Sequence, residues 1–140
     1  METKFIHPLV LAYVGDSVLE ILTREHIVSE LKILKPQLLQ NESIYYVSAK
    51  AQESFMKYAL KEKLFTEEEL TFYARGKNAK DTRSLKNTSQ KTHRISSGFE
   101  AILGHLHLTG QNERIREIFE CYKIFVIQKR NENETNLRQK

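Results

Sequence analysis

Two acidic residues, Asp16 and Glu100, stand among apolar and small residues in segments typical of a buried helix. Residues 11–19 read LAYVGDSVL, and residues 96–104 read SSGFEAILG. Burying an ionised carboxylate is costly unless it is paired, hydrogen-bonded or bound to a metal. Small residues beside both acids let two helices approach and leave space at the carboxylates: Gly15, Ser17, Ser97, Gly98 and Gly104. Two carboxylates with no obvious fixed cation favour a hard divalent metal such as Mg²⁺, which keeps several waters and shares phosphate oxygens.

The same two acids also admit a purely structural interpretation. A buried Asp or Glu is more often a helix cap or an ion-pair partner than a metal ligand. Glu20, one turn after Asp16, can pair with Arg24 at the i, i+4 spacing. The sequence offers no HExxH zinc motif and no GxxxxGK[ST] or GxGxxG nucleotide loop. The single cysteine, Cys121, lies in an apolar stripe and is interpreted as part of the core.

Positive charge is concentrated in residues 75–94, which read RGKNAKDTRSLKNTSQKTHR. This segment holds seven Lys or Arg against one Asp, whereas the rest of the chain has 15 basic and 17 acidic residues. A cluster of positive charge on a nearly neutral body indicates a polyanionic partner. A solvated loop without a partner is the alternative. The polar stretch 81–91 is longer than most loops of compact domains, which favours a functional or flexible segment.

Apolar residues recur at helical spacing along most of the chain, which predicts an all-α bundle of five or six helices. Pro8 suits the first position of a helix over 8–31, and Pro36 suits the start of a second helix that reaches about residue 61. Thr66 with Glu69 forms a capping box that opens a third helix, expected to end near Gly76. A fourth helix precedes Gly110, and a fifth begins near Asn112.

Length and composition place these helices in one domain. The chain has 140 residues, of which 40% are hydrophobic and 29% charged, as in ordinary globular domains. We expect a folded domain over 1–130 and a polar, frayed tail over 131–140. No apolar run approaches the roughly 18 residues of a membrane span, so no membrane partner is expected. The single cysteine gives no disulfide framework, and a cytoplasmic location is expected.

Both acidic motifs resemble those of the ribonuclease III family. YVGDSVLE, around Asp16, is similar to the signature helix of that family, whose core reads FLGDSVL, and FEAILG, around Glu100, is similar to its second acidic motif, VEALIG. The two motifs have the order and spacing of one catalytic domain, and the resemblance covers residues 7–128. It implies the ribonuclease III catalytic-domain fold, an all-α helical bundle. Asp16 and Glu100 would then be catalytic residues and metal ligands.

The chain departs from the longer ribonuclease III enzymes at three acidic positions. Those enzymes carry acids where this chain has Ala12 and Ser97, and often a further acid where it has Leu9. Too few residues follow the catalytic domain for a separate double-stranded-RNA-binding domain. Together with RGKNAK at 75–80 and VSAK at 47–50, these features are similar to the stand-alone bacterial subfamily called Mini-III ribonuclease.

The resemblance implies a Mg²⁺-dependent endoribonuclease, with Mn²⁺ as a substitute, that cleaves double-stranded RNA. Its expected substrate is a stem of the 23S ribosomal RNA precursor, and its products carry 5′-phosphate and 3′-hydroxyl ends. It implies a homodimer joined through the apolar signature helix, with one site for each strand. Because duplex RNA is recognised largely by shape and phosphate contacts, basic residues are expected to bind it. The candidates are Lys50, Arg75, Lys77, Asn78, Lys80, Arg83, Lys86, Lys91 and Arg94.

Two other functions remain open at the level of sequence. A ribonuclease III-like domain that binds structured RNA without cutting it would explain the loss of acids at Ala12 and Ser97. A helical interaction domain whose basic loop docks an acidic protein would explain the charge cluster alone.

Overall fold

The computed structural model describes residues 1–80 and 89–139, with the side chains of 138 and 139 excepted. Six α-helices and no strands occur within these ranges, so the predicted all-α class is confirmed. The α-helices are α1 (Pro8–Glu25), α2 (Pro36–Val47), α3 (Ala49–Lys61), α4 (Glu67–Asn78), α5 (Gln90–Leu108) and α6 (Asn112–Gln139). A 3-10 turn, η1 (Thr3–Phe5), precedes α1, and a short π-helix, η2 (His26–Glu30), follows it. No helix of the described residues has both the length and the apolar content to cross a membrane.

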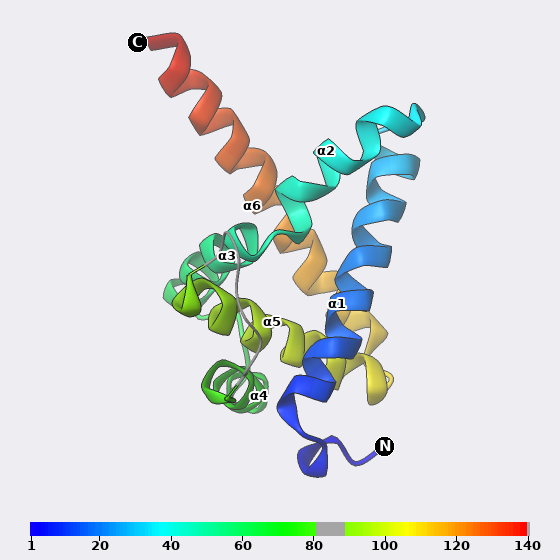
Figure 1. Ribbon diagram of the computed structural model, residues 1–140, viewed down its shortest axis with the longest axis vertical. Helices are drawn as coiled ribbons and strands as arrows, with labels where there is room; N and C mark the ends of the chain where they lie inside the picture. Colours follow the sequence, from blue (N-terminus) through cyan, green and yellow to red (C-terminus); the bar gives the residue numbers. More distant parts are fainter. Residues whose placement is uncertain (81–88, 140) are drawn as a thin grey trace.

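Helix α5 is the centre of the bundle and packs against α1, α3, α4 and α6. Figure 1 shows α5 lying across the middle of the molecule, with α1 on one side and α3 and α4 on the other. The C-terminal half of α6 projects beyond the bundle. This arrangement follows from the sequence of α5, because its residues 95–106 are buried except for the half-exposed Glu100.

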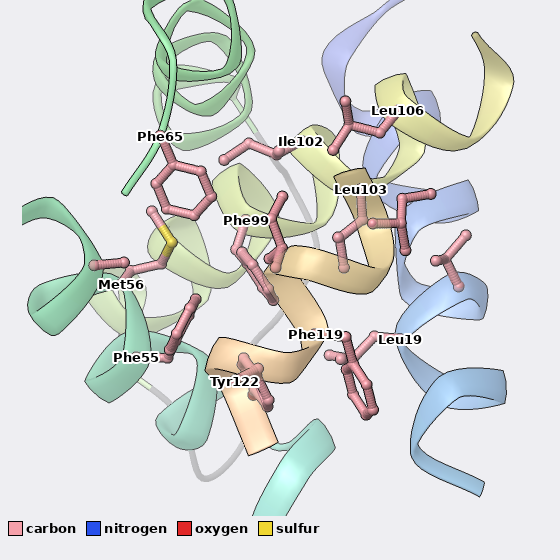
Figure 2. Close-up of a cluster of buried hydrophobic side chains, with 14 of the residues drawn as sticks. Leu19, Phe55, Met56, Phe65, Phe99, Ile102, Leu103, Leu106, Phe119 and Tyr122 are labelled. Atoms are coloured by element: carbon pink, nitrogen blue, oxygen red, sulfur yellow. The ribbon is translucent and has the colours of Figure 1, made fainter. Parts of the chain in front are cut away.

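The core is aromatic where α3, α5 and α6 meet. The ring centroid of Phe55 lies 5.6 Å from that of Phe99 and 4.8 Å from that of Tyr122. Figure 2 shows these rings together with the aliphatic side chains of α5 and α1 that extend the cluster. Each of the three rings is at most 1% exposed, so they anchor the helices that carry the candidate site.

Three helix starts are confirmed in detail. Pro8 opens α1 and Pro36 opens α2, each at the first helical position. At the start of α4, the Thr66 hydroxyl accepts from the Glu69 amide, and the Glu69 carboxylate accepts from the Thr66 amide. Burial favours a higher pKa for Glu69, but hydrogen bonds from Arg114 and Thr66 outweigh it and hold that pKa below its usual value.

Two predicted helix boundaries are wrong. The helix expected over 36–61 is two helices, because Ser48 takes an extended conformation and its hydroxyl accepts from the Ala51 amide as the N-cap of α3. Gly76 does not end α4 but lies inside it, where an added Cβ would stand 2.8 Å from the carbonyl oxygen of Ser97. Beyond residue 131, α6 continues as an exposed helix to Gln139, and the expectation that this tail frays stays a prediction.

Candidate active site

Two glycines allow α1 and α5 to cross with their backbones in contact. A Cβ added at Gly15 would stand 1.7 Å from the carbonyl oxygen of Glu100, and one added at Gly104 would stand 1.9 Å from that of Leu11. The close helix approach predicted from small residues is therefore present at these two positions. Gly98 allows a different helix to approach α5, because a Cβ added at Gly98 would meet the ring of Tyr73 on α4.

This crossing brings Asp16 and Glu100 to the wall of one cavity of about 530 Å³. Glu100 is half-buried, whereas Asp16 is exposed, so the expectation that both acids are buried is wrong for Asp16. The ion-pair role considered as the structural alternative belongs to Glu20, which pairs with Arg24 at the i, i+4 spacing with 3.3 Å between their charged atoms. The two acids expected to act together thus share one solvent-accessible site.

The same cavity contains the three positions at which the longer enzymes are expected to carry acids. Leu9, Ala12 and Ser97 all line it. Across the described residues, no group of three or more His, Cys, Asp or Glu side chains is placed to hold a metal ion. The carboxylate set of the cavity is therefore Asp16 and Glu100, with space where other acids would stand.

Gln52 of α3 connects the cavity wall to Glu100. Its Nε2 donates to Glu100 Oε2 at 3.2 Å and to the carbonyl oxygen of Val47 at 3.1 Å. Gln52 Oε1 is buried and has no hydrogen-bond partner among the described residues. Turning the amide over would place its oxygen against two acceptors, so the geometry favours this orientation.

The donor set of the cavity fits a hard divalent cation. Two carboxylates from different helices line one cavity, and Gln52, whose amide oxygen is buried, lines it as well. Oxygen ligands of this kind suit Mg²⁺, which is bound through one or two carboxylates and keeps several waters.

Tyr122 supports this site from inside the core. Burial, and then the charge of Glu100, raise the pKa of the Tyr122 hydroxyl far above its usual value. The hydroxyl donates to the backbone carbonyl of Tyr46 on α2. Tyr122 therefore stays neutral and fixes α2 and α6 behind the half-buried Glu100.

Six of the nine predicted RNA-binding residues lie around the end of α4 and the start of α5. Arg75 has a structural role, because its guanidinium donates to the carbonyl oxygen of Ile6 at 2.8 Å and lies over the Phe72 ring. Lys77, Asn78 and Lys80 follow it at the end of α4, and Lys91 and Arg94 lie in α5. Lys50 is exposed in the first turn of α3, and Arg83 and Lys86 lie outside the described residues.

Sequence reasoning missed Gln52 and His93, which also line the carboxylate cavity. A signal for Gln52 was available, since it precedes the buried Phe55 and Met56 by three and four residues and so shares their helix face. A polar residue on a buried face requires partners, and Glu100 is one of them. His93 gives no comparable signal, because it lies in a polar stretch.

Comparison with known proteins identifies relatives over most of the chain. Residues 9–111 match the family model described as the ribonuclease III domain. A protein named Mini-ribonuclease 3 from Enterococcus faecalis is 46% identical over 121 residues, which cover 86% of this chain and 91% of the relative. A protein of the same name from Staphylococcus aureus is 43% identical over 82% of this chain and 85% of its own.

The fold also resembles a solved structure. The crystal structure of a protein from Fusobacterium nucleatum matches with a TM-score of 0.74 and 23% identity, over 83% of this chain and 92% of that one. This match supports the arrangement of the helices around α5.

Proposed function

The chain belongs to the ribonuclease III family, among proteins named Mini-ribonuclease 3, and from this premise we propose that Asp16 and Glu100 cleave double-stranded RNA with the help of Mg²⁺. The family consists of endoribonucleases that act on double-stranded RNA and generally depend on divalent metals. The observation that carries the proposal is the convergence of Asp16 and Glu100, 84 residues apart, on one cavity. We further propose a cytoplasmic enzyme that trims the 23S ribosomal RNA precursor.

In this proposal Asp16 and Glu100 hold Mg²⁺ directly or through water. The cation, when bound, lowers the pKa of a water and offsets charge on the scissile phosphate. Gln52 keeps Glu100 in place through the hydrogen bond that its Nε2 donates to Glu100 Oε2. The uncharged Leu9, Ala12 and Ser97 leave room in the cavity for water and for phosphate oxygens of the substrate.

Hydrolysis of long duplex RNA with Mg²⁺ tests the proposal. Fragments with 5′-phosphate and 3′-hydroxyl ends are expected, and a chelator should abolish them. A protein that binds duplex RNA but yields no metal-dependent fragments would instead be the binding domain considered above. The same cleavage of single-stranded RNA would contradict the proposed substrate class.

Replacing Gln52 separates its support of the metal site from its support of the fold. Gln52→Leu removes the donor to Glu100 and the unpartnered oxygen, so we expect Mn²⁺ to bind roughly 10–100-fold more weakly. The free energy of unfolding should change by no more than about 1 kcal/mol, because a buried acceptor without a partner is also removed. Calorimetric titration with Mn²⁺ and thermal unfolding without metal measure the two effects. Unchanged Mn²⁺ affinity would contradict the role given to Gln52.

A homodimer through α1 is the arrangement that we propose for cutting both strands. The outer face of α1 carries Val10, Tyr13 and Ile21, which are 51%, 78% and 53% exposed. An exposed apolar stripe on one helix face is typical of a protein interface. A two-fold axis beside it would give each strand of the duplex its own carboxylate cavity.

Tyr13→Glu is expected to dissociate this dimer. Burying a charge in place of an exposed aromatic anchor costs at least about 2 kcal/mol, which is roughly a 30-fold weaker Kd. Sedimentation equilibrium measures the effect. Ile124→Glu on α6, which replaces a side chain that is 54% exposed, is the matched control and should leave the mass unchanged. If Tyr13→Glu has the same mass as the parent protein, α1 is not the interface.

A further inference from the structure

Two adjoining cavities form a groove along α3 that is lined by basic side chains. The first, of about 530 Å³ between α3, α4, α5 and α6, contains Lys57, Lys77, Lys91 and Lys129. The second, of about 270 Å³ where α2 and α3 meet α6, contains Lys50, Lys129 and Arg130. Because Ser54 and Lys129 line both cavities, the two lie side by side along α3, and we call them together the basic groove.

The positive charge of the basic groove is largely uncompensated. Lys57, Lys77, Lys91 and Lys129 make no ion pair with any described residue, whereas Arg130 pairs with Glu42. Glu53 is the one carboxylate among the described residues that line the groove, and its Oε1 already accepts from Thr92 at 3.2 Å. The four lysines come from four different helices, so the fold itself gathers them. Such a cluster attracts a polyanion whose charges are spaced along the groove.

Aromatic side chains in the same groove favour a strand with exposed bases. Tyr45 is 48% exposed, and the Arg130 guanidinium lies over its ring at 3.9 Å. Phe125 is half-buried in the groove and packs against the exposed Tyr58, with 5.1 Å between ring centroids. Stacking of a base on an aromatic ring contributes about 1–3 kcal/mol. In a duplex the bases are hidden in the stack, so this surface favours single-stranded RNA.

The basic groove begins beside the carboxylate cavity. Val47, Ala49 and Gln52 line the cavity, whereas Ser48, Lys50 and Ala51 line the groove, so the N-terminal turn of α3 separates the two. The amide groups of a helix N-terminus favour phosphate. An RNA strand that leaves the carboxylate cavity therefore passes the N-terminal turn of α3, which favours its phosphates, and then reaches the lysines of the basic groove.

We propose that the basic groove binds single-stranded RNA that continues from the strand cut at Asp16 and Glu100. This inference rests on the proposed function, because it takes the cleaved strand to pass through the carboxylate cavity. It predicts that a duplex with an unpaired extension binds more tightly than the same duplex with blunt ends.

The test compares three RNAs by fluorescence anisotropy without divalent metal: a blunt duplex, that duplex with an oligouridine extension, and oligouridine alone. The extension should tighten binding about tenfold, the gain expected of two phosphate contacts. The Lys57→Glu and Lys129→Glu double variant should lose this gain, and its salt dependence should fall by about 0.7 per lysine. Lys61→Glu with Arg116→Glu, the same charge change on α3 and α6 outside the groove, should keep it.

Three results would overturn the inference. In the first, the extension does not tighten binding. In the second, the double variant weakens the binding of blunt duplex as much as that of extended duplex, which would assign the groove to duplex RNA. In the third, a polyglutamate peptide binds as tightly as oligouridine, which would indicate an acidic protein partner. Cleavage of blunt duplex with Mg²⁺ is scored separately. If the extension tightens binding but no RNA is cut, the proposed function fails and the groove assignment stands.

Discussion

Asp16→Asn is expected to reduce Mg²⁺-dependent cleavage of long duplex RNA by more than about 100-fold. Loss of a group that only orients a metal ligand already costs 10–100-fold, and Asp16 is proposed to hold the metal itself. The fold should be unaffected, because Asp16 is exposed and makes no hydrogen bond or ion pair with a described residue. A substitution of this kind changes the free energy of unfolding by about 0.5 kcal/mol or less.

The binding of RNA provides the internal control for Asp16→Asn. Removing a negative charge from a phosphate-binding surface should leave metal-free duplex binding as tight as before or tighter. Glu20→Gln, one turn further along α1, removes a carboxylate that pairs with Arg24 and should keep full activity. Cleavage within tenfold of the parent protein, with unchanged binding, would remove Asp16 from the mechanism.

The two remaining carboxylates explain why such a large loss is expected from one substitution. Leu9, Ala12 and Ser97 line the cavity without charge, so no nearby acid replaces Asp16. Mg²⁺ retains several waters and can be held by only one or two carboxylates. When only two are present, each supplies a larger part of the free energy of metal binding. Mn²⁺ affinity should therefore fall together with activity in Asp16→Asn.

Local signals predicted the helix starts well and the helix interruptions badly. Pro8 and the Thr66–Glu69 capping box act within one turn, so the sequence alone reveals them. Ser48 gives no sign of a break in the sequence, because apolar spacing continues across it and only its own extended backbone divides α2 from α3. Gly76 indicates a helix stop from the sequence alone, but it is a contact glycine whose partner, Ser97, lies on another helix.

The residues of the candidate site and of the basic groove also differ in how well the sequence predicts them. Asp16 and Glu100 stand out in sequence because each is an acid in an apolar segment beside a contact glycine. Lys57 and Lys129 carry no such signal, since a lysine on an exposed helix face is ordinary. They become a cluster with Lys77 and Lys91 only when four helices pack, which spacing along the chain does not encode.

Gly15→Ala is expected to destabilise the protein by about 3 kcal/mol or more and to lower its Tm by about 10 °C. The added methyl group would stand 1.7 Å from the carbonyl oxygen of Glu100, so α1 and α5 must separate. Overpacking often costs less because a flexible side chain moves aside. Here the obstacle is the backbone of the helix that forms the centre of the bundle.

The same separation of α1 and α5 should disturb the site, because Gly15 contacts Glu100 and is followed in the chain by Asp16. At temperatures where the variant remains folded, Mn²⁺ should bind more weakly to Gly15→Ala than to the parent protein. Ser17→Ala, at an exposed position two residues along α1, is the matched control, and alanine there should keep both Tm and Mn²⁺ affinity. A Gly15→Ala variant that melts within 2 °C or so of the parent protein would mean that the helices part at little cost. The close crossing of α1 and α5 would then not be what holds the two carboxylates together.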